Sequence, residues 1–364
     1  MYDIALQVPV IGMPWEDFIL LAITALAGGA FGAAIGALPA FIFTGFVVFL
    51  GEGLAILQRA VGGAVGSVNP GELAAGVTGT IGFGAITGPH IAFAGGVAAS
   101  AYAGKKYPEM EPDGWDYHFG KNILYAFGTK PDILAVGAIF GVVGMLINRV
   151  GAAVLVSGNT AFTDTIALSV VATAFLARIA FGYPIVGKAA GSSLLDMSPF
   201  EREEPHARAD GGEVAMEHKG RLATEPWLPH QYKWAGVTAI GLVGGLLGGY
   251  IYIQTESIFL GYAISAMSLL FLQLGVEKIP VTHHITLIGA VGAVLFLPGA
   301  GAVPALIAAG IFGAISGLLG EITQRIFYSH SGTHVDPPAM AIVIAMLVVG
   351  VLAIAGVLPN AGYL

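Results

Sequence analysis

The chain of 364 residues has no cysteine and little charge. The absence of cysteine excludes a disulfide framework and a thiolate metal site. Charged residues make up 10% of the sequence, whereas a soluble domain averages about 25%. The net charge of −8 provides no basic surface, so nucleic acid is not an expected partner. With 56% hydrophobic residues and a mean hydropathy of +0.81, the composition indicates a membrane protein.

Long uncharged runs indicate membrane-spanning helices. Residues 18–50 and 73–104 carry no charged side chain and exceed the ~20 residues that one helical crossing requires. No alternating polar and apolar pattern recurs, which argues against a barrel of strands. We therefore predict an all-α, polytopic integral membrane protein of about ten transmembrane segments, including broken or re-entrant helices. Its expected location is the inner (plasma) membrane of a prokaryotic cell, with membrane lipids around it.

The lysine and arginine residues divide the chain into two membrane halves. Most of the 15 basic residues fall within 105–130 and 188–233. Two apolar crossings separate these stretches, so both should emerge on one side, which the positive-inside rule makes cytoplasmic. We expect an N-terminal membrane half (1–187), a mostly flexible hydrophilic linker (188–233) and a C-terminal membrane half (234–364).

The two halves share short sequence similarities that predict an internal repeat. Residues 36–40 (GALPA) resemble 301–305 (GAVPA), and each is followed by a Gly-Glu pair that ends an apolar run, at Glu52 and at Glu321. Separately, the segment that begins at His90 resembles the one that begins at His284. Transporters built from repeats place their sites at the repeat interface.

Histidines recur at glycine- or proline-containing breaks in the apolar runs. The polar residues at the three breaks are Thr87 and His90; Thr282, His283 and His284; and Thr333, His334 and Asp336. Non-helical backbone at membrane depth must be buried in protein or line a wet cavity, and polar side chains there mark pathways. We expect His90 and His284 to line one cavity between the halves, beside Thr87 and Thr282. The alternative is that each is a neutral histidine that stabilises its break.

Three carboxylates at the boundaries of apolar runs are further candidates, with Asp164 at the start of a run and Glu52 and Glu321 at the ends of runs. Asp164 lies among threonines, which could help to coordinate Na⁺, although an N-terminal helix cap explains the same pattern. Glu52 and Glu321 are followed by Arg59 and Arg325 at helical spacing, so each could instead form an ion pair at the membrane boundary.

A metal site is an alternative interpretation of the histidine pattern. His283, His284, His334 and Asp336 provide nitrogen and oxygen ligands that suit zinc or another divalent ion. The sequence has no HExxH helix signature that would support such a site.

Two glycine-rich segments resemble the large membrane subunit of tripartite tricarboxylate transporters. Residues 32–39 are similar to the early G-x3-G-x-x-P segment of that family, and residues 84–106 stand where the family has a Pro-Gly-Thr-Pro loop. Residues 279–290 resemble the second such loop, although histidines replace loop residues in both places. The resemblance implies a secondary carboxylate carrier in which loops 87–98 and 280–290 face each other.

These features together predict a secondary active transporter for a small anionic, carboxylate-type solute. The coupling ion would be H⁺ or Na⁺, with no other cofactor and no catalytic residues. An anion suits helix breaks because half-helix N-termini present free N–H groups and the positive end of the dipole. A homo-oligomer or a membrane complex is expected. The alternatives are a passive channel, a membrane subunit of a larger ion-translocating complex, and a histidine-based metal transporter or enzyme.

Overall fold

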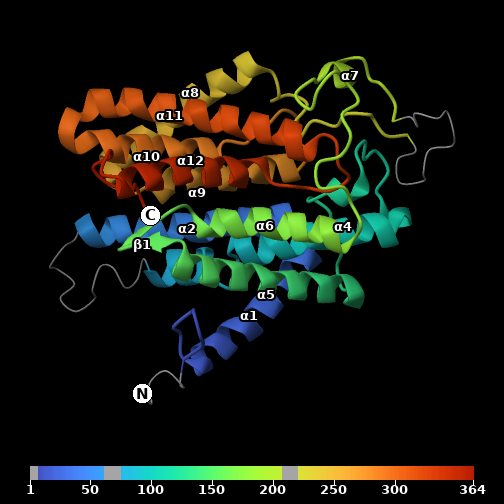
Figure 1. Ribbon diagram of the computed structural model, residues 1–364, viewed down its shortest axis with the longest axis horizontal. Coiled ribbons are helices and arrows are strands. Elements are labelled where there is room, and N and C mark those ends of the chain that lie inside the picture. Colours follow the sequence, from blue (N-terminus) through green and yellow to red (C-terminus); the bar gives the residue numbers. More distant parts are fainter. Residues whose placement is uncertain (1–6, 61–74, 207–219) are drawn as a thin grey trace.

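The computed structural model describes residues 7–60, 75–206 and 220–364, and these residues form a helical protein (Figure 1). The helices of the first half are α1 (Trp15–Ile35), α2 (Ala37–Ala60), η2 (Ala75–Gly82), η3 (Pro89–Phe93), α4 (Ala94–Lys106), α5 (Pro131–Val154) and α6 (Thr165–Ala180). Those of the second half are α8 (Trp234–Thr255), α9 (Phe259–Gln273), α10 (His283–Ala300), α11 (Ala302–Thr323), η7 (Gln324–Tyr328) and α12 (Pro337–Ile354). Short elements lie between them: η4 (Pro108–Met110), η5 (Phe119–Lys121), the hairpin β1 (Val156–Ser157) and β2 (Thr160–Ala161), and α7 (Ser198–Glu201).

Seven helices among the described residues are long and apolar enough to cross a membrane. They are α1, α2, α5, α8, α10, α11 with η7, and α12, whereas α6 and α9 are apolar but shorter. The expected all-α class is confirmed, and the seven long apolar helices agree with a membrane-embedded protein by their length and composition. The number of full-length spans in the described residues is lower than the expected total of about ten segments.

Each half contains a trio of helices that meet at glycines. In the first half α1, α4 and α5 pack together, and a Cβ atom on Gly95 would lie only 2.5 Å from the carbonyl oxygen of Gly29. In the second half α8, α10 and α11 pack together, and a Cβ atom on Gly289 would lie 2.5 Å from the Cα atom of Gly245. Small residues allow this approach because backbone can then contact backbone.

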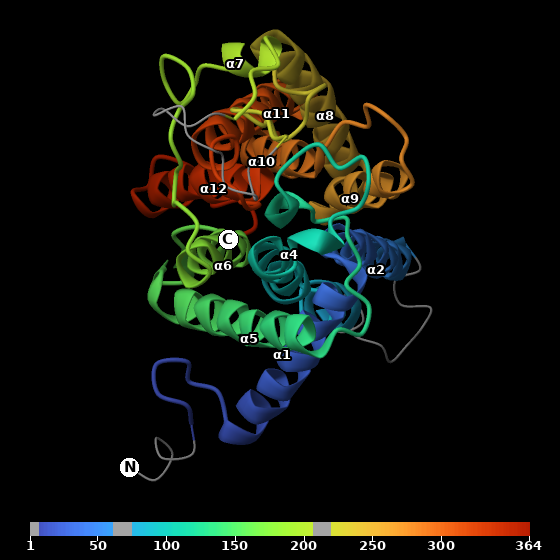
Figure 2. The ribbon, with the colours of Figure 1, turned by 90° about the vertical axis from the view of Figure 1, so that its right-hand side faces the viewer.

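The two halves contact each other through α2 with α9 and through α6 with α12 (Figure 2). Both pairs are antiparallel. At the end of α2, Arg59 donates a hydrogen bond to the carbonyl of Thr255, which ends α8 just before α9. At the start of α6, the hydroxyl of Thr163 donates to the carbonyl of Val343 in the middle of α12. Figure 2 shows the second half above the first, with α1 reaching away from the body.

The helical path from η2 to α4 is interrupted by a turn. The helix η2 packs along the C-terminal part of α2, ends at Gly82, and is followed by an irregular turn before η3 and α4 continue as one helix. The hydroxyl of Thr87 in this turn donates to the carbonyls of Ile81 and Gly82, and the Thr87 carbonyl accepts from Thr44 of α2. The turn is therefore held within protein.

The described part of the linker is docked onto the helices, which differs from the mostly flexible segment that we expected. Arg325 of η7 donates hydrogen bonds to the carbonyls of Leu195 and Tyr232, and the amide of Trp227 donates to Gln324. The linker contributes few apolar side chains, so the sequence did not indicate that its backbone would be held by hydrogen bonds from polar groups of η7.

Candidate functional site

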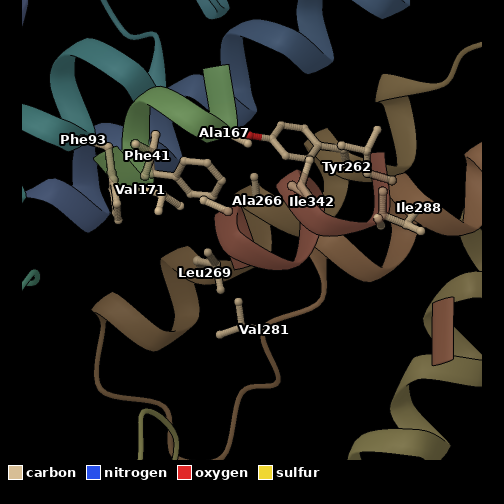
Figure 3. Close-up of a cluster of buried hydrophobic side chains, with 14 of the residues drawn as sticks. Phe41, Phe93, Ala167, Val171, Tyr262, Ala266, Leu269, Val281, Ile288 and Ile342 are labelled. Carbon is tan, nitrogen blue, oxygen red and sulfur yellow. The ribbon is translucent and has the colours of Figure 1, made fainter. Parts of the chain in front are cut away.

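A cavity of about 1450 Å³ lies between the two halves. Residues of α2, η3 and α6 line it from the first half, and residues of α9, α10 and α12 line it from the second. Its walls are rich in aromatic side chains, including Phe41, Phe93 and Tyr262, whose rings lie near one another in the cluster that Figure 3 shows. Leu269 and Val281 of the same cluster also line the cavity. The site is thus a mainly apolar space at the interface of the halves.

Four helices begin at this cavity. They are η3, α6, α10 and α12, and the residues that line the cavity at their starts are Pro89, Asp164, His283 and Asp336. Helix N-termini carry unsatisfied N–H groups and the positive end of the helix dipole. The cavity is therefore bordered by the N-terminal ends of four helices.

Aspartates cap two of these four N-termini. One oxygen of Asp164 accepts from the amide of Ala167 and the other accepts from the hydroxyl of Tyr363, both at 2.8 Å. One oxygen of Asp336 accepts from the amide of Ala339 at 2.8 Å, and the other lies 3.2 Å from Nε2 of His334. Among the described residues, neither carboxylate forms an ion pair with lysine or arginine. The cap that the sequence offered for Asp164 is present, and the same residue faces the cavity.

His283 provides an unsatisfied polar group at the start of α10. Its side chain is buried between aromatic rings, with centroid distances of 4.7 Å to Phe41 and 5.7 Å to Tyr262. Its Nδ1 atom has no hydrogen-bond partner among the described residues. Thr282, which precedes it, forms a hydrogen bond with Ser265 and does not cap the helix. His283 thus places an unsatisfied imidazole in the wall of the cavity.

The expected pairing of His90 with His284 in one cavity is wrong, because neither side chain lines it. The carbonyl of His90 lies against Gly144 of α5, while the carbonyl of His284 accepts from Ser316 of α11 at 3.0 Å. His283 and His284 are successive residues of α10, and successive side chains in a helix point about 100° apart, so the two rings cannot lie on one face. In the second half the ring at the cavity is that of His283, and His334 joins it from another segment.

Arg178 anchors the third break, a role that the sequence did not reveal. This residue lies in the last turn of α6, and its side chain is fully buried. Its guanidinium donates to the hydroxyl of Thr333 at 2.7 Å and to the Thr333 carbonyl at 2.9 Å. Thr333 is therefore a structural contact, while the neighbouring His334 lines the cavity.

Glu52 and Glu321 stabilise the helix ends and do not line the cavity. Glu52 accepts hydrogen bonds from the hydroxyls of Thr78 and Ser257, which connects α2 to η2 and to the start of α9. Glu321 forms the expected ion pair with Arg325, with 2.5 Å between Oε1 and Nε. Both residues belong to the scaffold around the site.

The described residues contain no group of three or more histidine, cysteine, aspartate or glutamate side chains that could hold a metal ion. His334 and Asp336 lie together, and His283 and His284 are neighbours in α10, but these four residues do not form one cluster. The geometry therefore gives no support to the metal alternative.

A buried ion pair that sequence analysis missed lies at one end of the cavity. Nζ of Lys121 is 2.7 Å from Oε2 of Glu225, and Lys121 also lies over the ring of Tyr328. Burial lowers the pKa of Lys121, while the charge of Glu225 opposes that shift. This pair joins the two hydrophilic stretches, which lie at the same end of the helices, as the distribution of basic residues predicted (Figure 1). No local pattern signals it, because the partners are far apart in sequence.

Comparison with known families adds one assignment. A family of unknown function, DUF7973, matches residues 10–364. The chain belongs to this family. Comparisons of this DUF7973 member with curated proteins and with solved structures found no match.

Proposed function

We propose that this DUF7973 member is a secondary active transporter that moves a small anionic solute through the cavity between its halves, coupled to H⁺ or Na⁺. The observation that carries the proposal is that four helix N-termini border one cavity between the halves. Broken helices that begin at a central site are how many secondary transporters bind substrate and ion. The location that fits this function is the cell membrane.

We further infer that the halves are an inverted repeat. Gly313 follows Gly141 by the same number of residues as Asp336 follows Asp164, so one alignment matches both pairs. Within each pair, the two residues make similar contacts. A Cβ atom on Gly141 would lie 2.5 Å from the carbonyl oxygen of Ala25, and one on Gly313 would lie 2.5 Å from that of Gly241.

The directions of the helices support the inverted orientation. In this alignment α5 corresponds to α11 and α6 to α12, so the expected match of 36–40 at α2 with 301–305 at α11 is not part of the repeat. Helices α6 and α12 pack antiparallel at the interface of the halves, as do α2 and α9. A two-fold axis perpendicular to the helices reverses their direction, which is the symmetry of inverted-topology repeats. Such repeats permit alternating access, because the two halves can exchange conformations around a central site.

Asp164 and Asp336 are the natural positions for the coupling cation. Both line the cavity, and neither has a lysine or arginine partner among the residues that the structure describes. An ionised carboxylate in such a place is costly unless a cation or proton compensates it. Binding of H⁺ or Na⁺ would also reduce repulsion of an incoming anion.

The resemblance to tripartite tricarboxylate transporters fits this proposal. It implies that loops 87–98 and 280–290 face each other, and Pro89 and Phe93 line the same cavity as Val281 and His283. A carboxylate carrier of that general plan is what we propose.

Uptake into proteoliposomes tests this function. The full chain is reconstituted, an inward H⁺ or Na⁺ gradient is imposed, and uptake of radiolabelled mono-, di- and tricarboxylates is followed. We expect one of these solutes to accumulate above its external concentration and to leak out when an ionophore abolishes the gradient. Equilibration without accumulation would indicate a channel, and no uptake of any carboxylate under either gradient would overturn the proposal.

A further inference from the structure

The four helix N-termini at the cavity fall into two chemically different pairs. Those of α6 and α12 are capped by the carboxylates of Asp164 and Asp336. Those of η3 and α10 have no side-chain cap. A carboxylate cap compensates the positive end of the dipole, so an incoming anion is attracted to the uncapped pair.

Within the uncapped pair, α10 has the additional polar group that recognition needs. His283 lines the cavity, is only 5% exposed, and has no partner at Nδ1 among the described residues. The corresponding cavity-lining residue of η3 is Pro89, which has no N–H group to donate. A buried polar atom without a partner costs free energy, which a ligand acceptor would recover.

The surfaces around His283 are apolar. Phe41 and Tyr262 contact its ring, and Phe93, Leu269 and Leu287 line the same cavity. The basic residues that line the cavity are Lys121 and Arg221, and both are already paired, with Glu225 and Glu111 respectively. A second anionic group on a ligand would therefore find no free lysine or arginine in the described lining, and Asp336 and Asp164 would repel it.

We propose that the cavity takes a monocarboxylate with an apolar body. Its carboxylate lies at the N-terminus of α10 and accepts a hydrogen bond from His283, while its body lies among Phe41, Phe93 and Tyr262. This inference rests on the proposed transport function and deepens it, because it selects one class of carboxylate and disfavours di- and tricarboxylates.

Equilibrium binding to the purified full chain in lipid nanodiscs tests the site without any gradient. The probes are phenylacetate, its neutral counterpart 2-phenylethanol and the dicarboxylate phenylsuccinate. Binding is measured by calorimetry and by intrinsic tryptophan fluorescence, to which Trp115 and Trp227 in the cavity lining contribute. Because a hydrogen bond to a charged group contributes about 1.5–3 kcal/mol, phenylacetate should bind at least about tenfold more tightly than either 2-phenylethanol or phenylsuccinate. Equal or weaker binding of phenylacetate would overturn the proposal, and this comparison requires no variant.

Variants then locate the carboxylate. His283→Ala should weaken phenylacetate binding about tenfold or more and leave 2-phenylethanol binding nearly unchanged. His283→Gln, which retains an N–H donor, should recover part of the difference. The matched control is His230→Ala, since His230 is an exposed histidine that contacts the carbonyl of Ile279 and does not itself line the cavity. Unchanged phenylacetate affinity in folded His283→Ala would overturn the assignment.

The outcomes for this site and for transport are distinguishable. Phenylacetate binding without gradient-driven uptake in proteoliposomes would support the site and count against transport. Coupled uptake of a di- or tricarboxylate together with no binding of phenylacetate would support transport and overturn this site.

Discussion

Asp164 and Asp336 hold the same local position at the starts of α6 and α12. Each accepts a hydrogen bond at 2.8 Å from the backbone amide three residues later, and each directs its other oxygen to a side chain, Tyr363 or His334. Both line the cavity between the halves. Each carboxylate thus combines a capping function with exposure to the central site, and substitutions can separate the two.

Alanine and asparagine at these positions should have different effects. Asp164→Ala and Asp336→Ala should each lower the free energy of unfolding by about 1 kcal/mol, because an N-cap is lost. Asp164→Asn and Asp336→Asn should retain stability, since asparagine caps equally well, but should abolish gradient-driven uptake. Thermal unfolding in detergent and proteoliposome uptake measure the two effects. If the asparagine variants retain coupled uptake, Asp164 and Asp336 act only as helix N-caps.

Glycines at the helix contacts should tolerate no side chain. A Cβ atom on Gly32 would overlap the carbonyl oxygen of Ala92, and one on Gly248 would overlap that of Thr286. Gly32→Ala and Gly248→Ala should each destabilise the protein by about 1–3 kcal/mol. The controls are Gly53→Ala and Gly236→Ala, in α2 and α8, where no described atom lies within 4 Å of the added Cβ. Equal unfolding midpoints for the two groups would contradict this packing.

The buried ion pair between Lys121 and Glu225 should behave as a coupled unit. Lys121→Met leaves a buried carboxylate unpaired, and Glu225→Gln leaves a buried ammonium unpaired, so each should cost about 3–5 kcal/mol. The double variant should lose much less than the sum of the two single losses. The wild type, the two single variants and the double variant form a double-mutant cycle, which is measured by their unfolding. Additive losses in the free energy of unfolding would show that the pair is not coupled.

The two hydrophilic stretches should be accessible from one side of the membrane. The chain has no cysteine, so Glu109→Cys and Arg202→Cys introduce unique labelling sites in the two stretches. An impermeant thiol reagent should label both from the cytoplasmic side only, because of the positive-inside rule. Ser157→Cys, in the β1–β2 hairpin, is the control and should be labelled from the opposite side. Labelling of Glu109→Cys and Arg202→Cys from opposite sides would contradict the arrangement.

Acidification should weaken the docking of the linker at His330. Burial lowers the pKa of His330, and its Nε2 lies 3.0 Å from the carbonyl of Leu194. Below the ordinary pKa of about 6.5, the unfolded chain binds a proton that the folded chain binds less readily. The contribution of His330 to the free energy of unfolding is therefore fully present above that pH and decreases as the pH falls. The unfolding midpoint of His330→Gln should decrease less between pH 7.5 and 5 than that of the wild type, and parallel curves would exclude this contribution.

Several features could be predicted because they depend on local sequence. Composition alone indicates a helical membrane protein, since lipid requires the backbone to satisfy its own hydrogen bonds. The Gly88-Pro89 and Pro337-Pro338 pairs mark helix starts, and η3 and α12 begin at Pro89 and Pro337. The ion pair of Glu321 with Arg325 follows from helical spacing.

Other features depend on what packs against each residue, and only the tertiary structure decided them. His283 rather than His284 reaches the cavity because α10 turns that face toward α2 and α9. Arg178 is buried because the chain around Thr333 folds over the end of α6, and the linker is held by polar groups of η7. These contacts join segments that are distant in sequence. The sequence by itself determined the class of the protein and the positions of its breaks, whereas the packing of the two halves determined which polar groups meet, because burial is set by neighbours that no local pattern specifies.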